Sequence, residues 1–176
     1  MTVFLRLFFI SLICLLPAAH SFSVENTAAS FVGADVCAGC HADQYSLWKG
    51  SHHDWAMQAA TQQSVLGDFN QTSFEHYGER TEFYRQGKDY YIKTQNAEGK
   101  MQAFKVAYTF GFYPLQQYLI PFPDGRMQAL GVAWDSRPKA EGGQRWFHLY
   151  PDEAIPFDDV LHWTGPYFTW NTRCAD

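Results

Sequence analysis

The stretch TEFYRQGKDYYIKTQ, residues 81–95, predicts two β-strands joined by a tight turn. Polar and aromatic side chains alternate over residues 81–86, which is the spacing of a strand with one buried face. Gly87 and Lys88 then form the expected turn. Residues 89–95 are rich in the aromatic and β-branched side chains that favour strands. We therefore expect an antiparallel hairpin here.

Further strands are expected after this hairpin, over residues 101–110, 115–122 and 127–134. The segments between them contain the Gly, Pro, Asn and Asp residues that are typical of turns. Residues 73–150 are thus predicted to form an antiparallel β region of about five strands. Short helices are expected before it, over residues 22–72. The expected fold class is α+β, with the short helices packed on the antiparallel sheet.

The segment 22–72 contains the most specific motif of the chain, CAGCH at residues 37–41. Two cysteines three residues apart, followed at once by histidine, are typical of covalent haem c attachment. Cys37 and Cys40 would form thioethers with the haem vinyl groups, and His41 would be the proximal iron ligand. The expected cofactor is therefore haem c with its iron.

A CxxC pair can have other roles. A thioredoxin-like redox pair requires a βαβ context, which the surrounding sequence lacks. A zinc site requires a second pair of ligands to complete a tetrahedron, and the sequence offers no second CxxC or HxxxH. A simple disulfide in an exported protein is the remaining alternative.

Residues 1–21 predict a secretory signal peptide, with Arg6 before an apolar run over 7–19 and small residues up to Ser21. The run is shorter than the ~20 residues of a membrane span, so no stable span is expected after cleavage, although an uncleaved anchor is the alternative. Haem c is attached to proteins outside the cytoplasm, so the predicted signal peptide is consistent with haem attachment at the CAGCH motif. The expected location is periplasmic or extracellular.

Other histidines are candidates for the second axial position of the iron, because His and Met are its common sixth ligands. His53 and His52 follow the motif, and Met57 lies on the same face as His53 if residues 51–60 form a second helix. His148 and His162 are the remaining candidates. Each of these histidines could instead be a hydrogen-bonded structural residue.

His41 also begins an aromatic face, because Tyr45 and Trp48 follow it at helical spacing. We expect these two rings to flank the haem or to pack beneath it. Residues 151–176 look like a loop that leads to Cys174. Cys174 either begins a second, truncated CxxCH motif in a chain that continues, or it is a free or intermolecular thiol.

The composition restricts the function classes. Hydrophobic residues make up 47% of the 176 residues and charged residues 18%, which is enough apolar material for a packed core. The formal net charge is −5 and no long basic run occurs, so nucleic acid is not an expected partner.

Several longer blocks resemble a known family: the W-x-x-S-x-H-x-x-A pattern at 48–56, and residues 108–111, 114–119, 142–153 and 161–165. They are similar to the multihaem c-type cytochromes whose CxxCH domains are often followed by tetratricopeptide repeats. The resemblance implies that His41 is a proximal ligand, that His53 ligates a neighbouring haem, and that Cys174 begins a second CxxCH motif.

The expected function is electron transfer to redox protein partners whose identity the sequence does not give, and no catalytic residues are expected. Two alternatives stay open. A haem with an open sixth position would suit a subunit of a multihaem oxidoreductase. An exported β domain whose CxxC pair is only a disulfide would be a binding module without haem.

Overall fold

The computed structural model describes residues 30–175. Every helix and strand named below belongs to the part of the chain that begins at Ala34. The predicted signal peptide over residues 1–21 lies outside the described residues. Among residues 30–175, no helix is long and apolar enough to cross a membrane.

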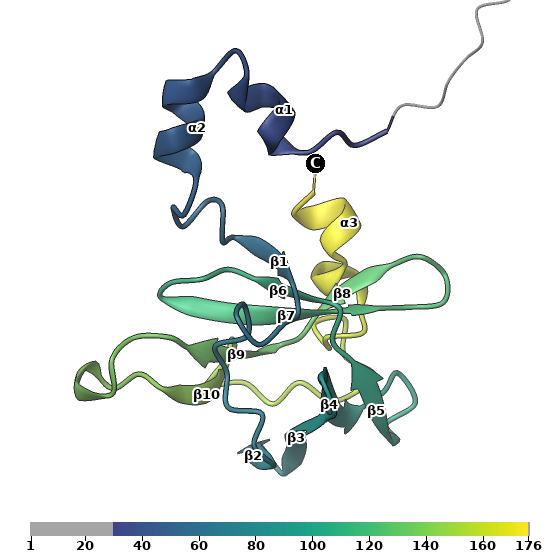
Figure 1. Ribbon diagram of the computed structural model, residues 1–176. Helices are drawn as coiled ribbons and strands as arrows, with labels where there is room; N and C mark the ends of the chain where they lie inside the picture. Colours follow the sequence, from purple (N-terminus) through teal and green to yellow (C-terminus); the bar gives the residue numbers. More distant parts are fainter. Residues whose placement is uncertain (1–29, 176) are drawn as a thin grey trace, which may run out of the picture. The chain divides into compact units, whose positions relative to one another are not determined.

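Residues 30–175 contain ten β-strands, which form two antiparallel sheets (Figure 1). The six-stranded sheet has the order β1-β6-β7-β9-β10, and β8 pairs with β7 beside this path. Its strands are β1 Met57–Ala59, β6 Tyr108–Phe110, β7 Leu115–Pro121, β8 Met127–Ala129, β9 Val132–Asp135 and β10 Arg145–His148. The four-stranded sheet follows the chain, with β2 Thr72–His76, β3 Glu79–Gln86, β4 Asp89–Gln95 and β5 Met101–Lys105.

The helices are short. They are α1 Ala34–Ala38, α2 Ala42–Trp48 and α3 Trp170–Arg173, with 3-10 turns η1 Lys139–Glu141 and η2 Pro166–Phe168. Neither α1 nor α2 contains a buried residue. The α+β class with antiparallel sheets is confirmed, and β3 with β4 is the hairpin predicted over residues 81–95.

The strands are more numerous than the expected five, because two expected strands are each divided, 101–110 into β5 and β6 and 127–134 into β8 and β9, and because β1, β2 and β10 are not among the expected strands. Residues 101–110 form β5 in the smaller sheet and β6 in the larger sheet. The chain crosses between them at two adjacent residues: the N–H of Val106 donates to the carbonyl of Tyr90 in β4, and the N–H of Ala107 donates to Leu119 in β7.

The second helix expected over residues 51–60 is not formed. Residues 51–56 make turns, with the N–H of Trp55 bonded to the carbonyl of Ser51, and residues 57–59 are strand β1. Met57 pairs with Phe110 of β6. Pairing with a distant strand thus outweighs the local helix signals, and His53 and Met57 do not share a helix face.

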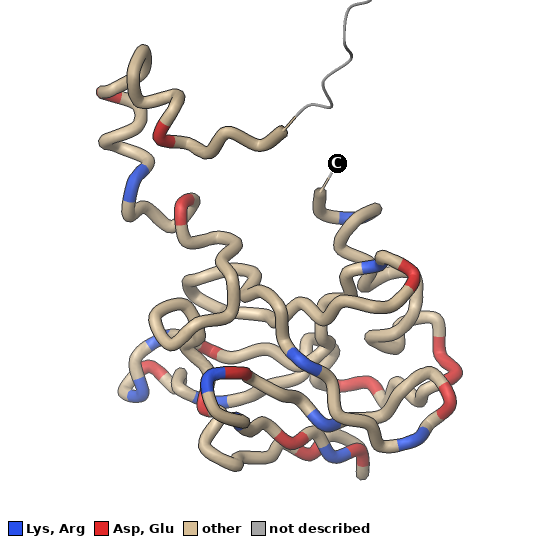
Figure 2. Tube along the Cα trace, turned by 45° about the vertical axis from the view of Figure 1, so that its right-hand side comes forward, with Lys and Arg blue, Asp and Glu red and all other residues tan. Residues whose placement is uncertain are grey.

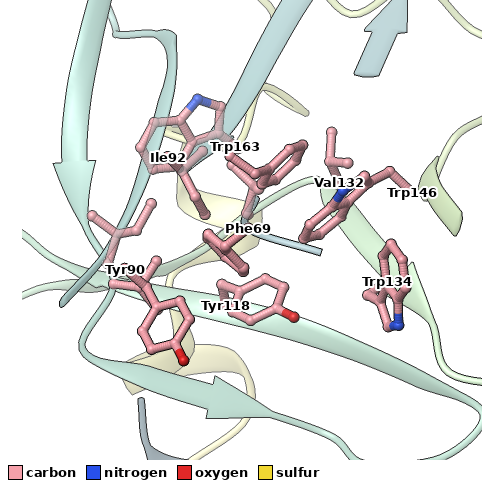
Figure 3. Close-up of a cluster of buried hydrophobic side chains, with 12 residues drawn as sticks. Phe69, Tyr90, Ile92, Tyr118, Val132, Trp134, Trp146 and Trp163 are labelled. Carbon is pink, nitrogen blue, oxygen red and sulfur yellow. The ribbon is translucent and has the colours of Figure 1, made fainter. Parts of the chain in front are cut away.

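Phe69 lies at the centre of the main core (Figure 3). It is 2% exposed, and its ring makes edge-on contacts with four other rings at centroid distances of 5.1 to 5.7 Å. These partners come from both sheets: Phe83, Tyr90, Tyr118 and Trp146. The loop that carries Phe69 therefore joins the two sheets.

A buried amide fixes that loop. The side chain of Gln116 in β7 accepts a hydrogen bond from the N–H of Leu66 and donates one to the carbonyl of Ser64, both at 2.9 Å. The N–H of Gly67 donates to the hydroxyl of Tyr118 at 2.9 Å. These bonds satisfy polar groups that would otherwise be buried without partners.

Candidate functional site

The CAGCH motif joins α1 to α2. The N–H of Cys40 and the N–H of His41 both donate to the carbonyl of Cys37, at 3.2 and 2.9 Å, so the motif forms one helical turn. His41 is the residue before α2, and its side chain is exposed. Cys37 and Cys40 are exposed free thiols. Both sulfurs and the imidazole are therefore accessible on one short turn.

A groove lies between the two helices beside the motif. It is lined by Ala34, Cys37, His41, Gln44, Tyr45 and Trp48. The rings of Tyr45 and Trp48 lie 5.9 Å apart between centroids. The expected common face of His41, Tyr45 and Trp48 is thus confirmed, and it includes the first thiol of the motif. Cys40 does not line this groove.

A hydrogen bond ties the two helices together. The hydroxyl of Tyr45 donates to the carboxylate of Asp35. This bond raises the pKa of Tyr45, and burial and the nearby charge of Asp35 act in the same direction. The hydrogen bond therefore holds the ring of Tyr45 against the groove.

The helical segment also exposes apolar side chains. Leu47 is 81% exposed and Val36 is 63% exposed. Over residues 34–48 only Asp35 and Asp43 are charged, whereas charges of both signs are interspersed over the strands (Figure 2). Two helices of five and seven residues bury too little to be stable alone. A bulky apolar group in the groove would supply the missing contacts.

The two adjacent histidines have different surroundings. The ring of His52 packs against Phe112 and Tyr113, at centroid distances of 5.3 and 5.9 Å. The ring of His53 is exposed and makes no hydrogen bond or ring contact within residues 30–175. His53 is therefore the more available of the two for a metal ligand.

His148 and His162 line a different cavity, which lies between the two sheets and includes no residue of α1, α2 or the motif. The structure brings them together with His76, whose ring stacks on that of His148 at 4.1 Å and 12°. No motif or spacing in the sequence singles out His76. The stacking of His76 on His148 in β10 depends on how the two sheets pack together, and no local sequence pattern indicates that packing.

Cys174 follows α3 and is exposed. It lines a third groove, over the larger sheet, whose other lining residues are mostly apolar and include Phe110, Tyr150, Tyr167 and Phe168. The structure thus does not bring Cys174 to the CAGCH groove.

Among residues 30–175, no group of three or more His, Cys, Asp or Glu side chains is arranged to hold a metal ion. The chain matches no protein-family model, no curated protein and no solved structure.

Acid is expected to destabilise the fold through the buried histidines. Burial lowers the pKa of His148 and of His162 below the usual 6.5. The unfolded chain therefore binds more protons than the folded chain once the pH falls below about 6.5, and the free energy of unfolding decreases. Urea denaturation between about pH 7 and pH 5.5 measures this loss. His148→Gln should reduce the pH dependence of the free energy of unfolding, because it removes one of these two groups. Equal pH dependence in His148→Gln and the parent chain would contradict the assignment.

Proposed function

We propose that this chain is an exported c-type cytochrome domain that carries covalent haem c and transfers electrons to redox protein partners. Cys37 and Cys40 would hold the haem through thioethers, and His41 would be the proximal ligand of its iron. The haem, when bound, supplies an iron that changes between the ferric and ferrous states. The predicted signal peptide supports attachment outside the cytoplasm.

The observation that carries the proposal is the groove beside the motif. Cys37 and His41 line it together with two aromatic side chains, and both thiols of the motif are free. A haem edge needs flat apolar contacts of this kind, and its attachment needs unpaired thiols. The donor set and its surroundings therefore fit a covalently bound porphyrin.

The remaining residues of the site have supporting roles. Asp35 accepts the hydrogen bond of the Tyr45 hydroxyl and so holds this ring in the groove that His41 also lines. Trp48 adds a second ring. His53 is the proposed second axial ligand, either for this haem or for a neighbouring one, because its imidazole is exposed and has no partner in residues 30–175.

Intact mass spectrometry tests the proposal. The protein is produced in a cell with a haem-attachment system, and the purified chain is measured after denaturation. We expect the mass of the polypeptide plus one haem, and haem staining of the band on a denaturing gel. A mass equal to the bare polypeptide, from cells that load a control cytochrome, would overturn the proposal.

His41→Ala is expected to change the iron spectrum more than any other single histidine substitution. The reduced protein should lose the spectrum of a histidine-ligated haem, because no other histidine lines the groove. His53→Ala should leave the proximal bond intact and remove at most the sixth ligand. His76→Ala, in the cavity between the sheets, is the matched control. Optical spectra of the reduced proteins are the measurement. An unchanged spectrum for His41→Ala would reject the proximal assignment.

A further inference from the structure

The cavity between the two sheets is a second site, separate from the CAGCH groove. Strands of the smaller sheet contribute Phe74 and His76, the larger sheet contributes Val132 and His148, and the loop before α3 closes it with His162 and Trp163. Its volume is about 200 Å³. This is below the ~300–1,000 Å³ of sites for drug-sized ligands, so the ligand has to be small.

Each of the three histidines has one ring nitrogen occupied by the protein. Nε2 of His76 lies 2.9 Å from the carbonyl of Glu153, Nδ1 of His148 lies 3.1 Å from the N–H of Tyr150, and Nδ1 of His162 lies 2.8 Å from the hydroxyl of Thr164. The other nitrogen of each ring has no hydrogen-bond partner within residues 30–175. His162 is only 4% exposed. These unpartnered nitrogens line a cavity whose other walls are apolar except for Tyr77, Glu79, Thr81 and Thr94, so they are available to a polar group of a ligand.

Nδ1 of His148 lies 3.1 Å from both the N–H and the carbonyl of Tyr150. It can accept from the N–H when the ring is neutral and donate to the carbonyl when the ring is an imidazolium. Nδ1 of His162 lies 3.4 Å from the N–H of Thr164 and 2.8 Å from its hydroxyl, which can donate or accept. In these arrangements Nε2 of each ring carries a proton and can donate it to an acceptor in the cavity.

We propose that this cavity binds a small monocarboxylic acid with a short apolar tail, its two oxygens accepting hydrogen bonds from Nε2 of His148 and Nε2 of His162. The apolar walls, formed by Leu130, Val132, Ile155 and Trp163, would hold the tail. This inference goes beyond the proposed electron transfer and holds with or without haem.

Binding is coupled to a proton. Burial keeps His148 and His162 neutral at pH 7, because it lowers the pKa of both. A carboxylate therefore enters with one proton from solvent, which converts one imidazole to imidazolium. Three titratable groups lie near these rings. Asp159 raises the pKa of His162, and His76 lowers the pKa of His148. The third is Glu79 at the cavity wall, whose own pKa is raised by burial. The affinity should therefore rise about tenfold for each unit of pH decrease above the pKa of that imidazole.

Gly131 offers a variant that blocks the site with little effect on the fold. Its backbone does not require glycine, and a Cβ there would lie 3.4 Å from Nε2 of His148 and 3.8 Å from Trp163. The methyl group of Gly131→Ala would cover the donor on His148. His148→Gln is the second variant, since it removes the titrating ring.

Isothermal titration of the full chain with butyrate at about pH 7.5 and 6.5 tests the proposal, with butanol, butylamine and Zn²⁺ as comparison ligands. We expect butyrate to bind about tenfold more tightly at the lower pH, and to lose at least about tenfold in affinity in folded Gly131→Ala and in His148→Gln. His53→Gln should bind like the parent chain. The proposal would be overturned if butyrate did not bind, or if butanol bound equally well. It would also be overturned if the affinity for butyrate did not change with pH or in either variant, or if Zn²⁺ bound more tightly through the same histidines.

Discussion

Phe69→Ala is expected to lower the free energy of unfolding by about 3–5 kcal/mol. The ring is 2% exposed and contacts aromatic rings of both sheets edge-on. Its removal takes apolar area out of the core and leaves a cavity that four rigid neighbours cannot fill, because their own contacts hold them. Trp146, for example, is stacked on Phe83 at 3.5 Å. A small domain has a total stability of only about 5–15 kcal/mol, so the loss is a large fraction of it.

Chemical denaturation followed by tryptophan fluorescence measures this change. Phe157→Ala is the matched control, because it removes the same ring from a site that is 42% exposed. We expect the control to cost about 1 kcal/mol or less. A similar loss in both variants would mean that Phe69 is not the centre of the core.

The hairpin over residues 81–95 could be predicted because its signals are local. Alternation places Phe83 and Ile92 on the buried face, where both are fully buried and directly paired across the strands. The turn between them is short and contains glycine. Neither the faces nor the register of this hairpin depends on a distant part of the chain.

The division between the two sheets could not be predicted in the same way. Residues 101–110 form one continuous β-favouring run, yet Val106 bonds to β4 and Ala107 bonds to β7. Long-range packing decides which strand accepts the hydrogen bond from each of these two N–H groups.

The prediction of a helix after residue 50 is wrong for a related reason. Its capping contact is present, with the N–H of Asp54 bonded to the hydroxyl of Ser51, but pairing of β1 with β6 outweighs it.

The candidate site shows the same contrast. The groove face of His41, Tyr45 and Trp48 follows from helical spacing within eight residues, and the structure confirms it. The stack of His76 on His148 joins two sheets, and no spacing in the sequence points to it. Periodicity predicts contacts within one element, whereas a cavity between sheets depends on their relative placement.

Replacing both motif cysteines, Cys37→Ser with Cys40→Ser, is expected to abolish covalent haem completely. The proposed attachment uses only these two sulfurs, and serine forms no thioether with a vinyl group. Haem staining on a denaturing gel and intact mass measure the result. Cys174→Ser is the matched control. It removes another exposed thiol, from a groove whose lining residues include no histidine, so its haem content should equal that of the parent chain.

The single substitutions separate attachment from ligation. Cys37→Ser or Cys40→Ser alone leaves one thioether, so each should keep some haem through denaturation, at lower yield than the parent chain. The double variant would keep only the proposed bond from His41 to the iron, and denaturation would break that bond because it depends on the folded turn. Haem should therefore leave the double variant on the denaturing gel even if it is present in the native protein. Retention of stained haem by the denatured double variant would show that another residue makes the covalent link, and the assignment of Cys37 and Cys40 would be wrong.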